Sequence, residues 1–514
     1  MFEGFKELMN SNWVKIQPKW YHNKDWRLAT DIIYGWHINS NDSSPDTAIT
    51  YIKDAIGMTP ASMGSTTFNY GDWENAFFMP KPCMVKSNGI VDYYLDPNDY
   101  TKKEDGTASD ITDLNYDGNA MMEWPIIWWK YEADPDDEYG GYFYVANRQI
   151  DSTYECWCNY DCDNNITEHF YTAIYNGIIY DNKMRSLSGF KLTDYTTTAY
   201  STTQTTYDST KTYAVNDTVR YQGYAYKCIT AVETAEAFDP DKWTQIDVYA
   251  VGAKISTSGI MYQCITAVTQ VEAFDSAKWT QIAYNGNTAG QEEVNAATAN
   301  NTTTGKTEWY IDTWSDRLLI NGLLILMSKS LDTQGKFGQG VSGGSQTAKN
   351  NYTTGSLNNK GLFYGSTTGT STAVKVFGME NWWSLEFHRT AGLLGTSTGY
   401  AYKLTYGTKD GSTATSYNST GSGYLIVTQT RPASNYFNKA IYGKYGYLPA
   451  VTASTGTSVY YCDYYYAGNG FLLVGGAAAG GGIAGASFFI LASSFANRSW
   501  SIAASLTLKP LGSP

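Results

Sequence analysis

The chain has 514 residues, enough for several domains with well-filled cores, so it needs neither disulfides nor a metal ion to fold. Charged residues are only 17% of the sequence, whereas tyrosine (44 residues) and glycine (48 residues) are abundant. The formal net charge of −13 argues against nucleic acid as a partner, because phosphate contacts require clustered Lys and Arg.

The abundance of tyrosine has two interpretations. Tyr together with Ser, Gly and Asn is typical of binding loops, because its ring gives a large, stiff contact face with a polar tip. Tyr and Thr also suit the half-buried face of an ordinary β-sheet. Composition alone leaves both interpretations open.

The beginning of the chain contains many aromatic residues and few periodic runs. By position, we expect residues 1–45 to attach the protein to a larger assembly. Charged residues such as Glu3, Lys6 and Glu7 interrupt the first twenty positions, so no signal peptide is expected and the protein should be made in the cytoplasm. A helix is predicted at residues 46–56, with Asp46 as N-cap and with Ala48, Ile49, Ile52, Ala55 and Ile56 on one side.

Three clusters between residues 134 and 169 carry side chains that could catalyse or bind metal. The acidic residues 134–138 could supply the carboxylate pair of a glycosidase, but a solvated turn around Pro135 explains them as well. A second cluster, Cys156, Cys158 and Cys162 with His169, has zinc-ligand side chains but lacks the paired C-x2-C halves of structural zinc sites. A third, Asp161, Asp163 and Asn165, could contact calcium but lacks the glycine of an EF-hand loop. We therefore predict free thiols, no metal and no cofactor.

The clearest internal feature is a tandem repeat, in which Cys228 and Trp243 recur 36 residues later as Cys264 and Trp279. Its β-rich alternation and turn residues predict two small three-stranded modules, residues 207–246 and 247–283. Ser/Thr-rich stretches at 195–206 and 284–289 are predicted linkers. We expect the repeats, residues 205–284, to interrupt one large domain formed by residues 46–204 and 285–514.

Each repeat resembles the small carbohydrate-binding modules of the chitin-binding type, in which a tyrosine, a Y-x-C strand and a late tryptophan build a compact aromatic sheet. The resemblance implies Tyr207, Trp243 and Trp279 as sugar platforms, because an exposed ring can stack on the apolar face of a pyranose. The alternative is that both tryptophans form the cores of their own modules.

Two apolar stretches follow the repeats. Residues 315–329 predict a helix that is apolar nearly all round and is therefore buried. Residues 318–327 are too few to cross a membrane, and residues 471–492 contain six glycines, so we expect no membrane insertion. Residues 460–471 are too aromatic, and too interrupted by turn residues, for a normal core strand.

Several segments together are similar to a family of phage and prophage structural proteins. This family comprises tail-fibre or receptor-binding proteins with a C-type-lectin-like, formylglycine-generating-enzyme-like domain, including targets of diversity-generating retroelements such as the major tropism determinant. The resemblance covers roughly residues 46–195 and 290–514. It is carried by residues 67–76, 80–85, 91–100, 117–124, 185–189, 361–365 and 374–383.

The resemblance implies a β-rich α+β fold, a C-type-lectin-like domain interrupted by two small all-β modules, whose variable ligand face lies near the C-terminus. It implies a virion adhesin, on the surface of the phage particle, that binds a host cell-surface protein or glycan, contacts other virion proteins and forms a homotrimer. The ligand-binding positions that it implies are Tyr464, Tyr465, Tyr466, Asn469, Phe471, Phe488 and Asn497.

Two other functions stay open. The chain could be a structural decoration or fibre subunit of head or tail, in which aromatic surfaces serve assembly. A weaker hypothesis is a polysaccharide-degrading tail enzyme. Four isolated histidines and the absence of a G-x-S-x-G or H-E-x-x-H motif favour a protein that is not an enzyme.

Overall fold

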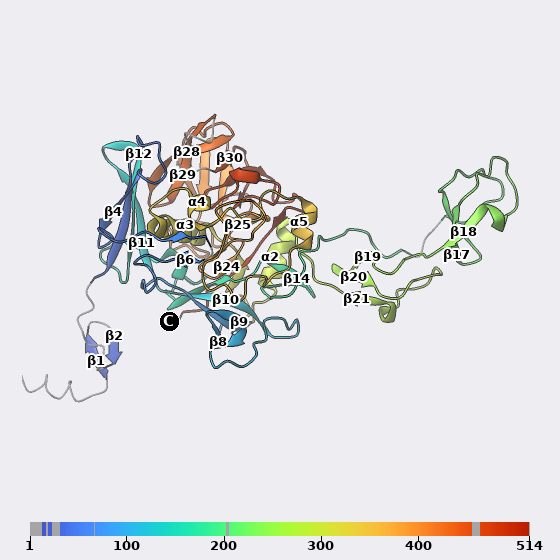
Figure 1. Cartoon of the computed structure of the whole chain (residues 1–514), viewed down its shortest axis with the longest axis horizontal. Coiled ribbons are helices and arrows are strands. Elements are labelled where there is room, and N and C mark those ends of the chain that lie inside the picture. The colour runs from blue at the N-terminus through green and yellow to red at the C-terminus, as the bar shows by residue number, and fades with distance from the viewer. Residues whose placement is uncertain are drawn as a thin grey trace, which may run out of the picture.

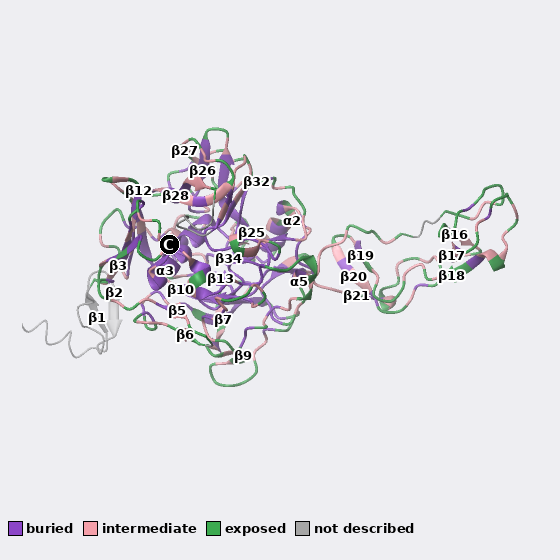
Figure 2. Ribbon diagram, turned by 45° about the horizontal axis from the view of Figure 1, so that its top comes forward, coloured by how far each residue is buried: buried purple, intermediate pink, exposed green. Residues whose placement is uncertain are grey.

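The computed structural model describes residues 31–65, 67–201, 205–454 and 463–512, together with the strands β1 (Trp13–Ile16) and β2 (Lys19–His22). A broad body holds most of these residues, and the repeats extend from it as a thin arm (Figure 1). Buried residues fill the body, whereas exposed and half-buried residues dominate the arm (Figure 2). The fold is β-rich α+β, as predicted.

A seven-stranded antiparallel sheet joins segments from both sides of the repeats. The C-terminal strand β34 lies between β13, which precedes the repeats, and β22, which follows them. Segments that precede and follow the arm therefore share one sheet of the body. In sheet order the strands are β22 (Trp309–Ile311), β34 (Leu506–Leu508), β13 (His169–Ala173), β10 (Gly118–Pro125), β7 (Lys81–Lys86), β8 (Val91–Asp96) and β9 (Asp99–Lys103).

A four-stranded antiparallel sheet corrects two predictions about the N-terminal region. The helix predicted at residues 46–56 is wrong, because Ile49 and Tyr51 are buried and Thr50 is exposed along a strand that pairs with β3. The predicted attachment segment must end before Ile33, since β3 belongs to the body; most of residues 1–30 lie outside the described residues. The strands are β11 (Trp128–Asp134), β12 (Asp137–Ala146), β3 (Ile33–Ile38) and β4 (Ile49–Lys53).

The third large sheet has nine strands and carries the C-terminal region. It is mostly antiparallel, but β30 runs parallel to β32, and β33 (Ile502–Ala503) runs parallel to β25. In order, the other strands are β27 (Leu425–Thr428), β26 (Gly399–Tyr402), β25 (Phe387–Thr396), β31 (Phe471–Val474), β32 (Phe489–Ser493), β30 (Tyr464–Tyr466), β28 (Asn435–Gly443) and β29 (Gly446–Ala453).

The helix predicted at residues 315–329 is confirmed as α3 (Trp314–Ser328), and every one of its residues is buried. Aromatic side chains of the four-stranded sheet donate hydrogen bonds to its main chain: Trp36 Nε1 to Gly322 O (3.0 Å) and Tyr131 OH to Leu318 O (2.8 Å). A Cβ at Gly322 would stand 2.6 Å from the Tyr131 hydroxyl, so this close approach requires glycine. The helix α3 is therefore the centre of the body.

Shorter elements complete the body. The helices are α2 (Gly290–Thr298), α4 (Thr333–Phe337) and α5 (Gln346–Asn351). Three two-stranded sheets pair β5 (Ser62–Met63) with β6 (Phe68–Asn69), β14 (Ile178–Tyr180) with β15 (Lys183–Arg185), and β23 (Lys375–Val376) with β24 (Met379–Glu380). In the part of the chain that the structure describes, no helix is both long and apolar enough to cross a membrane.

The repeats form two three-stranded antiparallel sheets, as predicted. We call residues 205–246 the distal module and residues 247–282 the proximal module. The second predicted linker is wrong, because Tyr284 pairs with Ile179 of the body and is 7% exposed. The strands are β16 (Thr218–Tyr221), β17 (Tyr224–Cys228) and β18 (Trp243–Ile246) in the distal module, and β19 (Lys254–Thr257), β20 (Ile260–Cys264) and β21 (Trp279–Gln281) in the proximal one.

Candidate functional site

The strand β30 presents two of its three tyrosines outward. Tyr464 and Tyr466 are half-buried, whereas Tyr465 between them is 0% exposed and belongs to the main hydrophobic core. This alternation follows from strand geometry, in which successive side chains point to opposite faces. Because β30 pairs with β28 on one side and β32 on the other, its outward residues stand on a fixed backbone.

A third tyrosine joins the outward pair. The Tyr436 ring, on β28, lies 5.3 Å from the Tyr464 ring in an edge-to-face contact, and the rings of Tyr464 and Tyr466 lie 4.5 Å apart. The buried Phe488 supports Tyr466 at 5.8 Å. We call Tyr436, Tyr464 and Tyr466 the tyrosine cluster. Contacts between rings of this kind hold each side chain in one orientation.

The loop after β30 is held close to the sheet. Arg431 donates hydrogen bonds to the main-chain oxygen of Gly468 and to Oδ1 of the exposed Asn469. A Cβ at Gly468 would lie 2.2 Å from the Cα of Ala492, so only glycine allows this approach. Asn469 is thus held exposed, three residues after Tyr466, by a loop with a defined shape.

Three of the seven predicted ligand-binding positions need correction. Tyr465, Phe471 and Phe488 are 0%, 4% and 1% exposed, so they support the surface and cannot contact a ligand in this conformation. Phe471 instead packs against Phe495, with 4.8 Å between the rings. Asn497 is exposed, on the loop between β32 and β33, and its role as a ligand-binding residue stays a prediction.

An acidic residue is buried directly beside the cluster. Asp463 is 1% exposed, and its Oδ2 accepts a hydrogen bond of 2.7 Å from the main-chain N–H of Ser487. Its Oδ1 has no partner among the described residues. Burial raises the pKa of this carboxyl well above its ordinary value, and the hydrogen bond from Ser487 offsets only part of that effect. The stability of the sheet around β30 should therefore depend on pH.

The two tryptophans predicted as sugar platforms are the cores of their modules. Trp243 and Trp279 are each 4% exposed, and Tyr207 is half-buried against Trp243. The exposed-platform prediction is therefore wrong for both tryptophans, and the alternative holds. The half-buried rings of the distal module are Tyr207, Tyr221, Tyr224, Tyr226 and Phe238, of which Tyr221 and Phe238 stack at 4.0 Å.

The core of the proximal module is completed by a tyrosine from outside its repeat. Tyr200 packs edge-to-face on Trp279 at 5.7 Å, as Tyr207 does on Trp243 at 5.5 Å. Their hydroxyls donate equivalent hydrogen bonds of 3.1 Å, to Glu272 O and Glu236 O. The 36-residue offset could not reveal this, because Tyr200 precedes Tyr207 by only seven positions. The first predicted linker therefore contains a structural residue.

The places proposed for chemistry hold ordinary structural contacts. Asp134 Oδ2 lies within hydrogen-bond distance of His37 Nε2, at 2.7 Å, and Asp137 accepts a hydrogen bond from the Ser40 hydroxyl at 2.5 Å, so both carboxylates tie the β11–β12 turn to β3 and the residues just after it. Within the described ranges, no group of three or more His, Cys, Asp or Glu residues could hold a metal ion. Cys83, Cys156, Cys158, Cys162, Cys228 and Cys264 are free thiols.

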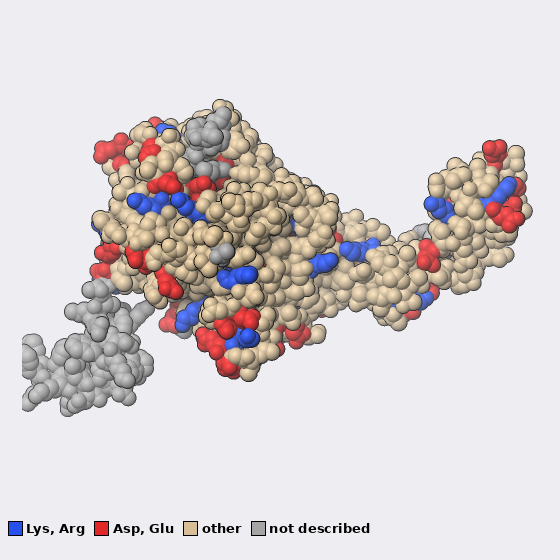
Figure 3. All heavy atoms as spheres, in the orientation of Figure 1, with Lys and Arg blue, Asp and Glu red and all other residues tan. Residues whose placement is uncertain are grey.

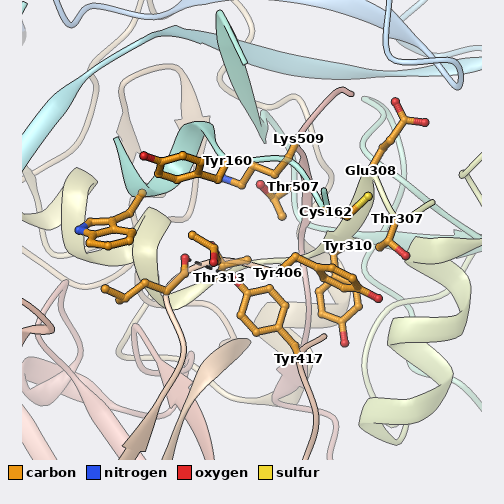
Figure 4. A pocket seen from close by; sticks show the side chains of 13 residues that line it. Tyr160, Cys162, Thr307, Glu308, Tyr310, Thr313, Tyr406, Tyr417, Thr507 and Lys509 are labelled. Carbon is orange, nitrogen blue, oxygen red and sulfur yellow. Dashed lines mark hydrogen bonds between the residues drawn. The ribbon is translucent and has the colours of Figure 1, made fainter. Parts of the chain in front are cut away.

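The enclosed cavity nearest to those cysteines is too small for a ligand. Its volume of about 10 Å³ is about the space of one water molecule. Tyr310, Tyr406 and Tyr417 gather on one side of it, and Thr507 and Lys509 lie opposite (Figure 4). Glu308 also lines it, and burial raises the pKa of that carboxyl. We assign the cavity no function.

Comparison with known proteins adds no relative. No protein-family model matches the chain, and no curated protein matches it. The interpretation of the tyrosine cluster therefore depends on its own geometry.

Proposed function

We propose that the protein is a non-enzymatic bacteriophage adhesin, which binds a protein or glycan on the host cell surface through the tyrosine cluster and Asn469. The observation that carries the proposal is the β30 strand, where two outward tyrosines flank a tyrosine fixed in the core. The proposal includes a C-type-lectin-like fold for the body and a place on the virion surface.

The cluster has the physical properties of a binding anchor. Its rings already pack on one another, so little side-chain entropy is lost when a ligand is bound. Each ring has an apolar face for stacking and a hydroxyl for hydrogen bonding. Most of the face of the protein shown in Figure 3 is uncharged, and acidic side chains gather over β8 and β9.

We further propose that three copies act together on the particle and contact other virion proteins. Several weak sites on one particle can raise the overall avidity by about 10²–10⁴ without any new contact. Light scattering of the purified protein should give the mass of a trimer. A stable monomer at micromolar concentration would contradict this part of the proposal.

The test compares the native protein with a triple variant, Tyr464→Ala, Tyr466→Ala and Asn469→Ala, for binding to cells of the bacterial host. Binding should weaken at least about 30-fold, because loss of a single anchor typically costs about 2 kcal/mol or more. Removing two half-buried rings should also cost some stability, so thermal unfolding must show that the triple variant is folded at the temperature of the binding assay.

The matched control removes another outward tyrosine pair. Tyr142 and Tyr144 are half-buried on β12, and their rings are 6.1 Å apart. Tyr142→Ala with Tyr144→Ala should leave cell binding unchanged. Full binding by a folded triple variant, or equal losses in both variants, would overturn the proposed site.

A structural role in the particle is the second candidate, and one feature of the arm favours it. Val215 and Ile229 in the distal module are exposed, and so are their repeat equivalents Val251 and Ile265 in the proximal module. Exposed aliphatic positions that recur in both modules suit contact with another protein. Replacing all four by Thr should prevent incorporation into particles if the arm serves assembly, and leave incorporation intact if it does not.

A further inference from the structure

A polar groove lies at the base of the arm, between the proximal module and the body. Its volume is about 550 Å³, which falls within the range of small-molecule sites. We call it the root groove. It is lined by residues 193–196, Lys254, Asn287, Gln346, Asn350 and residues 498–500.

One wall of the root groove is a fixed array of planar polar groups. Asp194 Oδ1 accepts a hydrogen bond of 2.9 Å from Lys349 Nζ, and its Oδ2 accepts from Gln346 Nε2 (2.6 Å) and Asn350 Nδ2 (3.0 Å). The Lys349 side chain is 0% exposed and also donates to Asn285 O at 2.6 Å. Asn350 Oδ1 is buried and has no hydrogen-bond partner among the described residues. This wall is rigid and retains an unused acceptor.

The groove also has two aromatic residues. Tyr195 is held by a ring contact of 4.8 Å with the buried Tyr284. Trp500 is half-buried, because it packs against a small core cluster that includes Leu385 and Ala478. In the described part of the chain, the indole N–H of Trp500 has no acceptor and Lys254 has no ion-pair partner. Unpaired donors are therefore available in the groove, and the Asp194 carboxylate, whose side chain is 14% exposed, supplies acceptor oxygens.

We propose that the root groove binds a short saccharide. A pyranose has an apolar C–H face that stacks on an indole or phenol ring, and hydroxyls that match planar amide and carboxylate groups. The root groove combines both kinds of surface. A lipid would leave its polar wall unpaired, at a cost in desolvation. The site goes beyond the proposed function, because it lies on different elements from the tyrosine cluster.

The test uses the full chain on an array of hexose, N-acetylhexosamine and uronic acid oligosaccharides. Trp500→Ala should weaken binding of the recognised saccharide at least about tenfold, equivalent to about 1.4 kcal/mol. Because Trp500 also packs on the body, a second variant, Thr196→Trp, fills the groove without removing a core contact and should weaken binding as strongly. Thermal unfolding of each variant shows whether it is folded.

Two controls separate this site from the others. Thr257 of the proximal module stands at the repeat position equivalent to Tyr221 of the distal module. The variant Tyr221→Thr should therefore not change saccharide binding. The triple variant of the tyrosine cluster should also bind the saccharide normally, so the root groove and the proposed function can fail independently. No binding of any oligosaccharide at millimolar concentration, or full binding by a folded Thr196→Trp protein, would overturn the proposal.

Discussion

The arm and the body are stabilised in different ways. Each module of the arm is built around aromatic rings such as Trp243 and Trp279, and its ion pairs, such as Lys242 with Glu236, stay at the surface. The body instead buries charges, including the pairs Arg389 with Glu293 and Arg317 with Asp312. The arm therefore depends on local packing, whereas the body also depends on buried ion pairs, of which Arg389 with Glu293 joins residues 96 positions apart.

The largest expected effect follows from breaking a buried pair of the body. Arg389 Nε donates to Glu293 Oε2 at 2.6 Å, and both side chains are at most 1% exposed. Arg389→Ala leaves a buried carboxylate unpaired and should destabilise the body by about 3–5 kcal/mol. Chemical denaturation measures this change.

The arm provides the control for that experiment. Lys242→Ala breaks the pair with Glu236, in which both side chains are 28% exposed, and should destabilise the distal module far less than Arg389→Ala destabilises the body. Similar losses in the two variants would contradict the distinction between arm and body.

An intermediate effect is expected for Tyr200, which precedes the distal module in sequence but packs in the proximal module. Tyr200→Ala should destabilise the proximal module by about 1–2 kcal/mol, because the ring is half-buried against Trp279. Tyr207→Ala should do the same to the distal module alone. Hydrogen exchange measured on peptides from each module separates the two; faster exchange in the distal module of Tyr200→Ala would contradict the assignment.

The smallest expected effect concerns pH. Burial raises the pKa of Asp463 above its unfolded value, so its contribution to stability is complete below the ordinary carboxyl pKa and is lost as the pH rises through the folded value. Asp463→Asn should therefore make the stability of the body fall less with rising pH above about 4.

A charge-matched variant in the arm checks this pH effect. Asp241→Asn, on an exposed turn of the distal module, removes the same formal charge and should leave the pH dependence unchanged. Parallel pH profiles for the native protein and Asp463→Asn, measured by denaturation, would contradict the role given to that carboxyl.

The elements predicted correctly are those whose structure follows from a pattern within their own segment of the sequence. The helix α3 has a long run of apolar residues, and each module repeats its own core, so both could be found without knowing their neighbours. The strand β4 was missed because Ile49, Ile52 and Ile56 fit one face of a helix; only the pairing with β3, which no local pattern shows, makes this segment extended.

The site was predicted only in part, although the sequence contained two more signals. Three successive tyrosines on one strand cannot share a face, so burial of Tyr465 follows once β30 is known to be a strand. The duplicated Thr-x-Tyr at 198–200 and 205–207 marks Tyr200. The root groove could not be predicted, because its walls come from segments more than 300 residues apart.

The most direct test of the central claim is photo-crosslinking on host cells. A photoreactive phenylalanine analogue placed at Tyr466 should form an adduct with a molecule of the host surface, because this ring faces outward in the tyrosine cluster. The same analogue at Tyr142 on β12 should form none. Adducts from both positions, or from neither while the protein still binds cells, would contradict the claim that the tyrosine cluster is the host-binding site.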